Sequence, residues 1–224
     1  MAEELDTAEE RNRIRQYYAS RGNRRWSGAT YVVAERQQML RRAVDFAGIR
    51  LDTAQILDVG CGTGGDLAFW HEQGVNQGRL FGTEILPERA AVAAAQLPTA
   101  TIVPVDGFTL PFDRGAFQVV SASMVLSSIV DDAARALLFA EMLRVTSSGG
   151  AVAVYDFRVR KPGNHSVVAM NRRRVTAMGG RPDAVWPAAP FLPLLPAVLK
   201  LPAALRNPIV RVLPRTHVLY LWRR

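Results

Sequence analysis

A glycine-rich stretch at residues 55–67, QILDVGCGTGGDL, limits what this chain can fold into more than any other part of it. Two apolar residues lead to Asp58, and four glycines follow: Gly60, Gly62, Gly64 and Gly65. This pattern predicts a buried strand, a tight turn and the start of a helix, as in the βα units that bind nucleotides. Glycine suits such a turn because the backbone takes unusual torsion angles and approaches a ligand closely. We therefore expect a nucleotide-type ligand at this turn, facing the helix N-terminus.

The glycine spacing alone does not identify that ligand. Gly60, Gly62 and Gly65 satisfy G-x-G-x-x-G, the dinucleotide pattern, which is compatible with an NAD-dependent oxidoreductase. Glu84 ends the next predicted strand, twenty residues after Gly64. A carboxylate at that position can accept hydrogen bonds from both hydroxyls of a ribose. Glu84 thus favours a nucleotide-type ligand without separating NAD from other ribose-containing cofactors.

Length and composition indicate one globular domain. The chain has 224 residues, and its mean hydropathy is +0.02, which fits a full-sized core. The first ten residues, MAEELDTAEE, do not fit a secretory signal. The single cysteine, Cys61, excludes an intrachain disulfide, and we expect a cytoplasmic protein. We interpret Cys61 as a small residue filling the glycine turn rather than as a nucleophile.

The net charge of +8 is concentrated in the last third of the chain. Residues 157–224 hold 13 basic side chains and one acidic side chain, whereas residues 1–156 hold 15 basic and 19 acidic ones. One interpretation is a surface that meets an anionic partner, such as a phosphorylated substrate, nucleic acid or acidic lipid. The other is a GC-rich genome, since 26 of the 28 basic residues are arginine. That composition explains the preference for arginine but not the missing acids.

Strand and helix patterns alternate along the chain, which predicts an α/β fold with a parallel sheet and right-handed crossovers. Two helices are expected within residues 3–47, where Tyr17, Tyr18, Trp26 and Tyr31 are candidates to line a cavity. A basic helix is expected from Asn164 to Met178. The apolar segment from Ala184 to Leu205 has the length of a membrane span, but its five prolines and Lys200 argue against one. We favour a rigid lid over an acceptor pocket, with an interfacial surface as the alternative.

The string from Asp58 to Gly64 resembles motif I of the class I S-adenosylmethionine-dependent methyltransferases. Residues 141–157, EMLRVTSSGGAVAVYDF, and the predicted last strand, THVLYLW (216–222), also resemble that family. The resemblance implies a Rossmann-like seven-stranded sheet, parallel except for an antiparallel last strand. It also implies an N-terminal helical cap (1–50), a cofactor-binding core (51–160), a basic, proline-rich substrate or lid region (161–215) and the last strand (216–224).

The resemblance also implies S-adenosylmethionine as the cofactor. Asp106 takes the position that bonds the adenine amino group, and Phe108 is expected to pack on the ring. Ser123 stands where magnesium-using members need an acid, so no metal site is expected. The cofactor-binding residues implied are Asp58, Gly60, Cys61, Gly62, Thr63, Gly64, Glu84, Ile85, Asp106, Gly107, Phe108 and Ser123.

Within that family the chain looks most similar to bacterial enzymes of sugar, polysaccharide and natural-product pathways, which implies O-methylation of a small-molecule hydroxyl. A hydroxyl acceptor needs a base to remove its proton, and histidine suits neutral pH. His165 follows the fifth strand, and His217 starts the last strand; we rank His165 slightly first. Asp156 is an alternative base. The acceptor is expected to be a sugar or a glycosylated or polyketide-type metabolite, anionic or lipid-linked.

Nucleic acid is not an expected partner. The segment Ser121–Met124 lacks the motif of amino-directed base methyltransferases, and no cysteine outside the glycine turn is available for carbon-5 chemistry. An RNA ribose methyltransferase stays an alternative, although its usual lysine is hard to place on Lys161 or Lys200. The basic last third also predicts peripheral contact with a membrane. The sequence does not indicate an oligomeric state.

Overall fold

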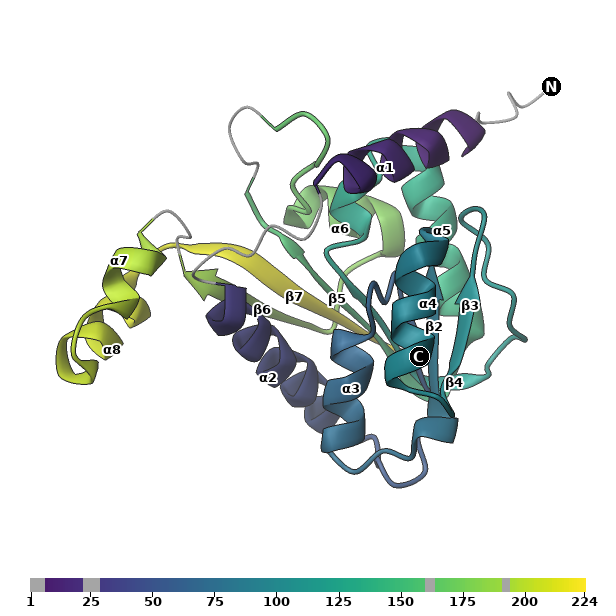
Figure 1. The fold of residues 1–224 in the computed structure, drawn as a ribbon, viewed down its shortest axis with the longest axis horizontal. Helices are drawn as coiled ribbons and strands as arrows, with labels where there is room; N and C mark the ends of the chain where they lie inside the picture. The colour runs from purple at the N-terminus through teal and green to yellow at the C-terminus, as the bar shows by residue number, and fades with distance from the viewer. Residues whose placement is uncertain (1–6, 22–28, 160–163, 191–193) are drawn as a thin grey trace.

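Seven strands form one sheet in the order β3-β2-β1-β4-β5-β7-β6 (Figure 1). The computed structural model describes residues 7–21, 29–159, 164–190 and 194–224. The strands are β1 (Ile56–Val59), β2 (Leu80–Glu84), β3 (Thr101–Pro104), β4 (Phe117–Ser123), β5 (Thr146–Phe157), β6 (Ala184–Pro190) and β7 (Arg215–Arg223). Strands β1 to β5 pair in parallel, and β7 runs antiparallel to both β5 and β6. This confirms the Rossmann-like sheet with an antiparallel last strand.

Helices cover both faces of the sheet. They are α1 (Thr7–Arg21), α2 (Ala29–Ala47), α3 (Gly65–Glu72), α4 (Pro87–Gln96), α5 (Asp132–Val145), α6 (Arg172–Gly179), α7 (Leu195–Leu199) and α8 (Ala203–Val212), with short 3-10 turns η1 (Gln77–Arg79) and η2 (Leu126–Ser128). Helices α2, α3 and α4 contribute to the core on one face, and α5 and α6 to the core on the other. The two helices expected near the N-terminus are therefore present, as α1 and α2.

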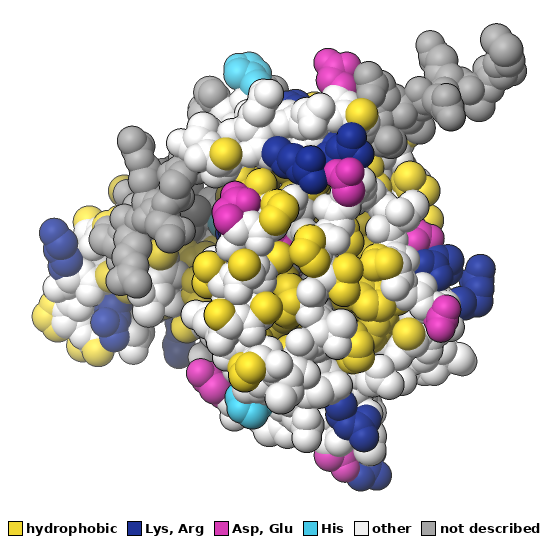
Figure 2. Space-filling view, turned by 45° about the vertical axis from the view of Figure 1, so that its right-hand side comes forward, with side chains coloured by type: hydrophobic (Ala, Val, Ile, Leu, Met, Phe, Trp, Pro, Cys, Tyr) yellow, Lys and Arg dark blue, Asp and Glu magenta, His cyan; other side chains and the backbone are white. Residues whose placement is uncertain are grey.

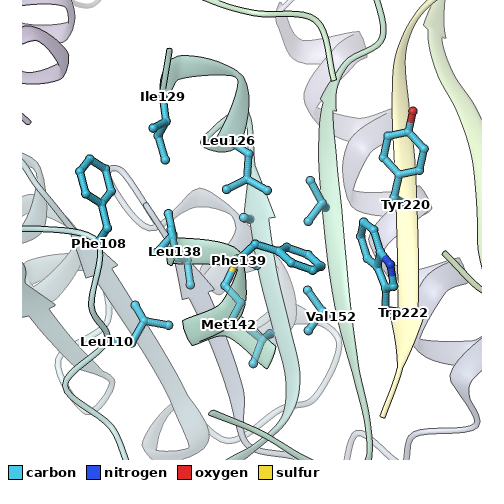
Figure 3. Packing of buried hydrophobic residues seen from close by; sticks show 14 of the residues in the cluster. Phe108, Leu110, Leu126, Ile129, Leu138, Phe139, Met142, Val152, Tyr220 and Trp222 are labelled. Carbon is cyan, nitrogen blue, oxygen red and sulfur yellow. The ribbon is translucent and has the colours of Figure 1, made fainter. Parts of the chain in front are cut away.

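Strand β5 contributes side chains to both hydrophobic cores, because its side chains alternate between the two faces of the sheet. Val152 and Val154 belong to the core under α5, whereas Ala153 and Tyr155 belong to the core under α2. Successive side chains of a strand point to opposite faces, so a strand buried on both faces reads as a continuous apolar run. Figure 3 shows the α5 side, where the Phe139 ring points toward Val152 and Trp222.

Helix α6 is shorter than the basic helix expected from Asn164 to Met178. It begins at Arg172 because the Asn171 side chain accepts a hydrogen bond from the Arg174 amide, at 3.0 Å, and caps the helix. The residues before it form a turn and an irregular segment, which backbone hydrogen bonds attach to the sheet region, from Val168 N to the Ser127 carbonyl and from Met170 N to the Phe157 carbonyl. Tertiary contacts thus override the helical pattern in this segment.

The apolar segment from Ala184 to Leu205 does not form a single element. Its first seven residues are β6, which pairs with β7. The rest contributes α7 and the start of α8, beyond residues 191–193, which lie outside the described part. In the parts of the chain that the structure describes, no helix combines the length and apolar character needed to cross a bilayer.

Phe139 tests how much the α5 face contributes to stability. It is fully buried, and its ring meets that of Trp222 edge to face, with centroids 4.7 Å apart. Phe139→Ala removes these contacts and leaves a cavity, so we expect the free energy of unfolding to fall by about 3–5 kcal/mol. Val92→Ala on the exposed side of α4 is the control and should change it by less than about 0.5 kcal/mol. Denaturant unfolding measures both, and equal effects would contradict the assignment of this core.

Candidate functional site

A cavity of about 410 Å³ opens at the carboxyl ends of β1, β2 and β4. In open α/β sheets this edge is where ligands bind. Helix α1 contributes Ile14 and Tyr18 to the wall, and α2 contributes Val33 and Arg36. Ten of the twelve residues predicted to bind a cofactor line this cavity: Asp58, Gly60, Cys61, Gly62, Thr63, Glu84, Ile85, Gly107, Phe108 and Ser123.

The glycine turn between β1 and α3 needs its glycines for two separate reasons. Gly60, Gly62 and Gly64 have φ angles of +68°, +59° and +88°, in the left-handed region that disfavours other residues. There is also no room for a side chain at Gly60, because a Cβ there would lie 2.5 Å from a methyl of Val125. Gly64 does not line the cavity, and a Cβ there would press on Ala93 of α4. The turn is therefore shaped both by its own torsion angles and by its neighbours.

Glu84 holds the turn in place. One carboxylate oxygen accepts a hydrogen bond from the Gly62 amide at 2.8 Å, and the other accepts one from the Leu86 amide at 3.0 Å. The Cys61 amide donates to the Thr83 carbonyl at 2.8 Å, which adds a second link to β2. Each carboxylate oxygen has a further lone pair. Glu84 can therefore fix the turn and still accept a hydrogen bond from a ligand.

Two more buried carboxylates border the cavity. Asp58 accepts a hydrogen bond from the Ser121 hydroxyl at 2.9 Å. Asp66 pairs with Arg36 at 2.6 Å and accepts a hydrogen bond from the Ser123 hydroxyl at 2.9 Å. Burial, with the nearby Asp66 carboxylate, raises the pKa of Asp58 to about 8. Asp58 is therefore largely protonated at neutral pH in the absence of a ligand, and a cationic ligand would favour its ionised form.

Cys61 is buried against Gly82, and its burial raises the thiol pKa above the ordinary range. A reactive cysteine needs the thiolate, so Cys61 fills space rather than acting as a nucleophile. The interpretation made from the sequence agrees with this environment.

Asp106 does not line the cavity. Its side chain is 68% exposed and pairs with Arg11 at 3.3 Å and Arg15 at 2.8 Å, both on α1. Its neighbours Gly107 and Phe108 do reach the cavity wall. In this structure Asp106 fastens α1 over the β3 end, which differs from the contact with an adenine amino group that the resemblance implied.

None of the three residues predicted as bases, His165, His217 and Asp156, lines the cavity. His165 is exposed. Asp156 is fully buried and accepts hydrogen bonds from the amides of Ser127 at 2.8 Å and Phe157 at 2.9 Å. Burial raises the pKa of Asp156 to about 6, against the opposing effect of these hydrogen bonds. Asp156 therefore holds η2 against β5.

His217 is on β7, and it is buried against the side chains of β5 that point to the opposite face of the sheet from Asp156. Its ring lies between those of Tyr155 and Phe157, with centroids 5.3 Å and 4.6 Å away, and Nδ1 is 3.0 Å from the Thr216 hydroxyl. Burial, together with the charge of Arg36, lowers the pKa of His217 to about 4. The imidazole is thus neutral at physiological pH.

Sequence reasoning missed several residues of the cavity wall. Arg36, Asp66 and Arg89 all line it. Asp66 had a signal, because it follows the glycine turn directly in the first helical turn. Arg36 had none, since its partner lies 30 residues away on another helix. Of the four aromatic candidates, Tyr18 lines the cavity, and Trp26 lies outside the described residues.

The other two aromatic candidates have different surroundings. The Tyr17 hydroxyl accepts a hydrogen bond from the Asn164 side chain at 3.2 Å, and Tyr31 packs beside α7 and α8. Among the residues with described positions, no group of three or more His, Cys, Asp or Glu side chains is placed to hold a metal ion.

Comparisons with known proteins agree with this geometry. Residues 56–150 match the family model described as "Methyltransferase domain". The demethylmenaquinone methyltransferase of Roseiflexus castenholzii is 34% identical over 110 residues, which cover 47% of this chain and 44% of that protein. The chloroplastic 2-phytyl-1,4-beta-naphthoquinone methyltransferase of Arabidopsis thaliana is 32% identical over 111 residues, or 46% of this chain and 41% of that protein. The chain therefore matches less than half the length of either relative.

Solved structures extend the likeness to nearly the whole chain. The geranyl diphosphate C-methyltransferase of Streptomyces coelicolor A3(2) superposes with a TM-score of 0.59, covering 91% of this chain and 86% of that one, at 20% identity. At that identity the likeness shows the fold alone. The family match and the sheet order nevertheless agree with the glycine turn and its buried acids. Residues 56–150 therefore match a methyltransferase domain, in a chain whose fold is similar to that of a solved methyltransferase.

Proposed function

We propose that this protein transfers a methyl group from S-adenosylmethionine to a small-molecule acceptor. The observation that carries the proposal is the cavity at the glycine turn, with three buried carboxylates in its wall. S-adenosylmethionine bears a cationic sulfonium and an ammonium group, which would favour the ionised form of Asp58. NAD carries an anionic pyrophosphate, which would oppose that ionisation.

The cavity residues fit the parts of this cofactor. The glycine turn would hold the methionine portion, Glu84 the ribose hydroxyls, and the apolar side chains of Ile85 and Phe108 the adenine ring. The Thr83 hydroxyl is buried at the cavity with no partner among the described residues, and it could serve as a polar contact. The bound cofactor supplies an activated methyl group. The protein then needs mainly to align the acceptor with it.

We further propose that the acceptor atom is a hydroxyl and that His217 removes its proton. One observation supports His217 over His165: Arg36, whose charge acts on the His217 imidazole, lines the cofactor cavity. His217 itself is buried and does not line that cavity, so the acceptor would have to reach it. The Tyr155 hydroxyl, buried and without a partner among the described residues, adds a polar group to the same face of the sheet. We propose an anionic or lipid-linked acceptor, of the sugar, glycosylated or polyketide type.

A second candidate is methylation of a prenylated acceptor. The two curated relatives are quinone methyltransferases by name, and the solved structure is a C-methyltransferase acting on geranyl diphosphate. Incubation with methyl-labelled cofactor and a panel of hydroxylated, quinone and prenyl diphosphate compounds separates the two. Mass spectrometry and NMR of the product then show whether oxygen or carbon received the methyl group.

Gly60→Ala tests the cofactor site. The new Cβ would collide with Val125, so we expect affinity for S-adenosylmethionine to fall roughly tenfold or more, or about 1.4 kcal/mol. Gly48→Ala is a matched control, since Gly48 also has a positive φ, +70°, but no atom within 4 Å of its Cβ position. Calorimetry with S-adenosylmethionine and with NAD measures both variants. Tight binding of NAD and none of S-adenosylmethionine by the unmodified protein would overturn the proposal.

Asp58 predicts how cofactor binding depends on pH. Its pKa of about 8 without ligand means that the carboxyl is largely protonated at neutral pH. A cationic ligand favours the ionised form, so binding releases a proton, and affinity should rise with pH by up to about tenfold per unit below that pKa. Asp58→Asn should bind more weakly and lose this part of the pH dependence. The cofactor's own titration is common to both proteins, so an identical pH profile would contradict the role of Asp58.

His217 predicts the pH profile of the transfer step. With saturating substrates, the transfer rate should not change between about pH 8 and about pH 5, because His217 stays unprotonated in this range. The rate should decline as the pH approaches 4, the pKa of His217. His217→Gln should slow O-methylation by about 10²–10⁴-fold with cofactor affinity unchanged. His165→Gln is the comparison. Full activity of both variants would refute a histidine base, and loss only in His165→Gln would restore the order expected from the sequence.

A further inference from the structure

Helices α7 and α8 form a projection at one end of the sheet (Figure 1). They lie between the end of β6 at Pro190 and the start of β7 at Arg215. Because β6 and β5 both run antiparallel to β7, this insertion leaves from the carboxyl edge of the parallel strands. The cofactor cavity opens at the same edge. We call residues 194–214 the projecting hairpin.

One side of the projecting hairpin holds it to the rest of the protein. Leu195 and Val198 of α7 and Val210 of α8 form a small buried cluster of their own, separate from the two main cores. Tyr31 and Val32 of α2 pack against this cluster. The side of α8 that carries Val210 is therefore covered by other residues of the same protein.

The other side of α8 is apolar and has no covering element in the described structure. Leu205 and Val212 have 57% and 81% of their surface exposed, and Pro208 between them is also exposed. Their spacing of three and four residues puts them on one face of the helix. Leu194, at the start of the hairpin, is 50% exposed. Solvated apolar groups gathered in this way mark an interaction surface.

The charges of this region have a single sign. From residue 194 to residue 215 the chain has four cations, Lys200, Arg206, Arg211 and Arg215, and no acid. Arg215 pairs with Glu35 of α2 at 3.5 Å, and the other three form no ion pair with a described residue. In Figure 2 the projecting part at the left shows hydrophobic and Lys or Arg side chains together. The partner must therefore be anionic and accept apolar groups.

We propose that the projecting hairpin docks on the surface of an anionic lipid bilayer. Apolar side chains beside arginines and lysines are the composition of interfacial helices, which insert their apolar face at the boundary of headgroups and acyl chains. The ten residues of α8 extend about 15 Å, half the thickness of the hydrocarbon core, so the helix lies along the surface. Where the proposed function holds, this docking would place the cavity edge near a lipid-linked acceptor.

Vesicle co-sedimentation of the full chain tests the proposal without any methyl-transfer reaction. We expect binding to phosphatidylcholine vesicles that contain phosphatidylglycerol, reversal by high salt, and much weaker binding to phosphatidylcholine alone. Leu205→Ser with Val212→Ser should weaken binding roughly tenfold or more. Lys200→Gln with Arg211→Gln should weaken it about fivefold for each charge removed.

Matched controls separate this surface from general effects. Val92→Ser on α4 and Arg114→Gln, both exposed and distant in sequence from the hairpin, should bind like the unmodified protein. Circular dichroism checks that each variant folds. Binding that is absent, or equal in all variants, overturns the proposal. So does a change of oligomeric state in Leu205→Ser with Val212→Ser, measured by light scattering without vesicles, because the face would then pair two copies of the chain.

Discussion

Burial of three carboxylates around one glycine turn is the constraint on which this structure depends. An ionised carboxylate is costly to bury unless it is paired or hydrogen-bonded. Glu84 meets this cost with two backbone amides, and Asp66 meets it with Arg36 and a serine hydroxyl. Among the described residues Asp58 accepts a hydrogen bond only from a serine hydroxyl, and burial raises its pKa. The bonds that link β1, β2 and β4 thus leave Asp58 as the carboxyl whose ionised form a sulfonium cofactor would favour.

The fold was predictable because its signals are local. Strands β1, β2 and β4 are apolar runs bounded by turn residues, which a sequence pattern can reveal. The helical pattern misleads where distant backbone groups compete for hydrogen bonds. Residues 164–171 have such a pattern, but Val168 and Met170 donate instead to the backbone of η2 and β5.

The candidate site likewise has residues that local sequence patterns predict and residues that depend on contacts between distant segments. The predicted residues that reach the cavity lie at the carboxyl ends of strands or in the turns after them, where chain order fixes position. The departures come from contacts between distant segments. Asp106 pairs with an arginine 91 positions earlier in the sequence, and His217 owes its lowered pKa to burial against residues of β5. No spacing rule in a single sequence reports such contacts, so the cofactor half of the site was easier to derive than the acceptor half.

The charge asymmetry of the sequence gains a physical meaning from this arrangement. The residues that line the cofactor cavity all come from the first 138 positions, where acids outnumber bases. Within the described structure, none of the cations after residue 156 reaches that cavity. Their excess therefore does not serve the cofactor. An anionic partner outside the cavity explains why acids are missing from the projecting hairpin, whereas a preference for arginine codons would explain only which cation is used.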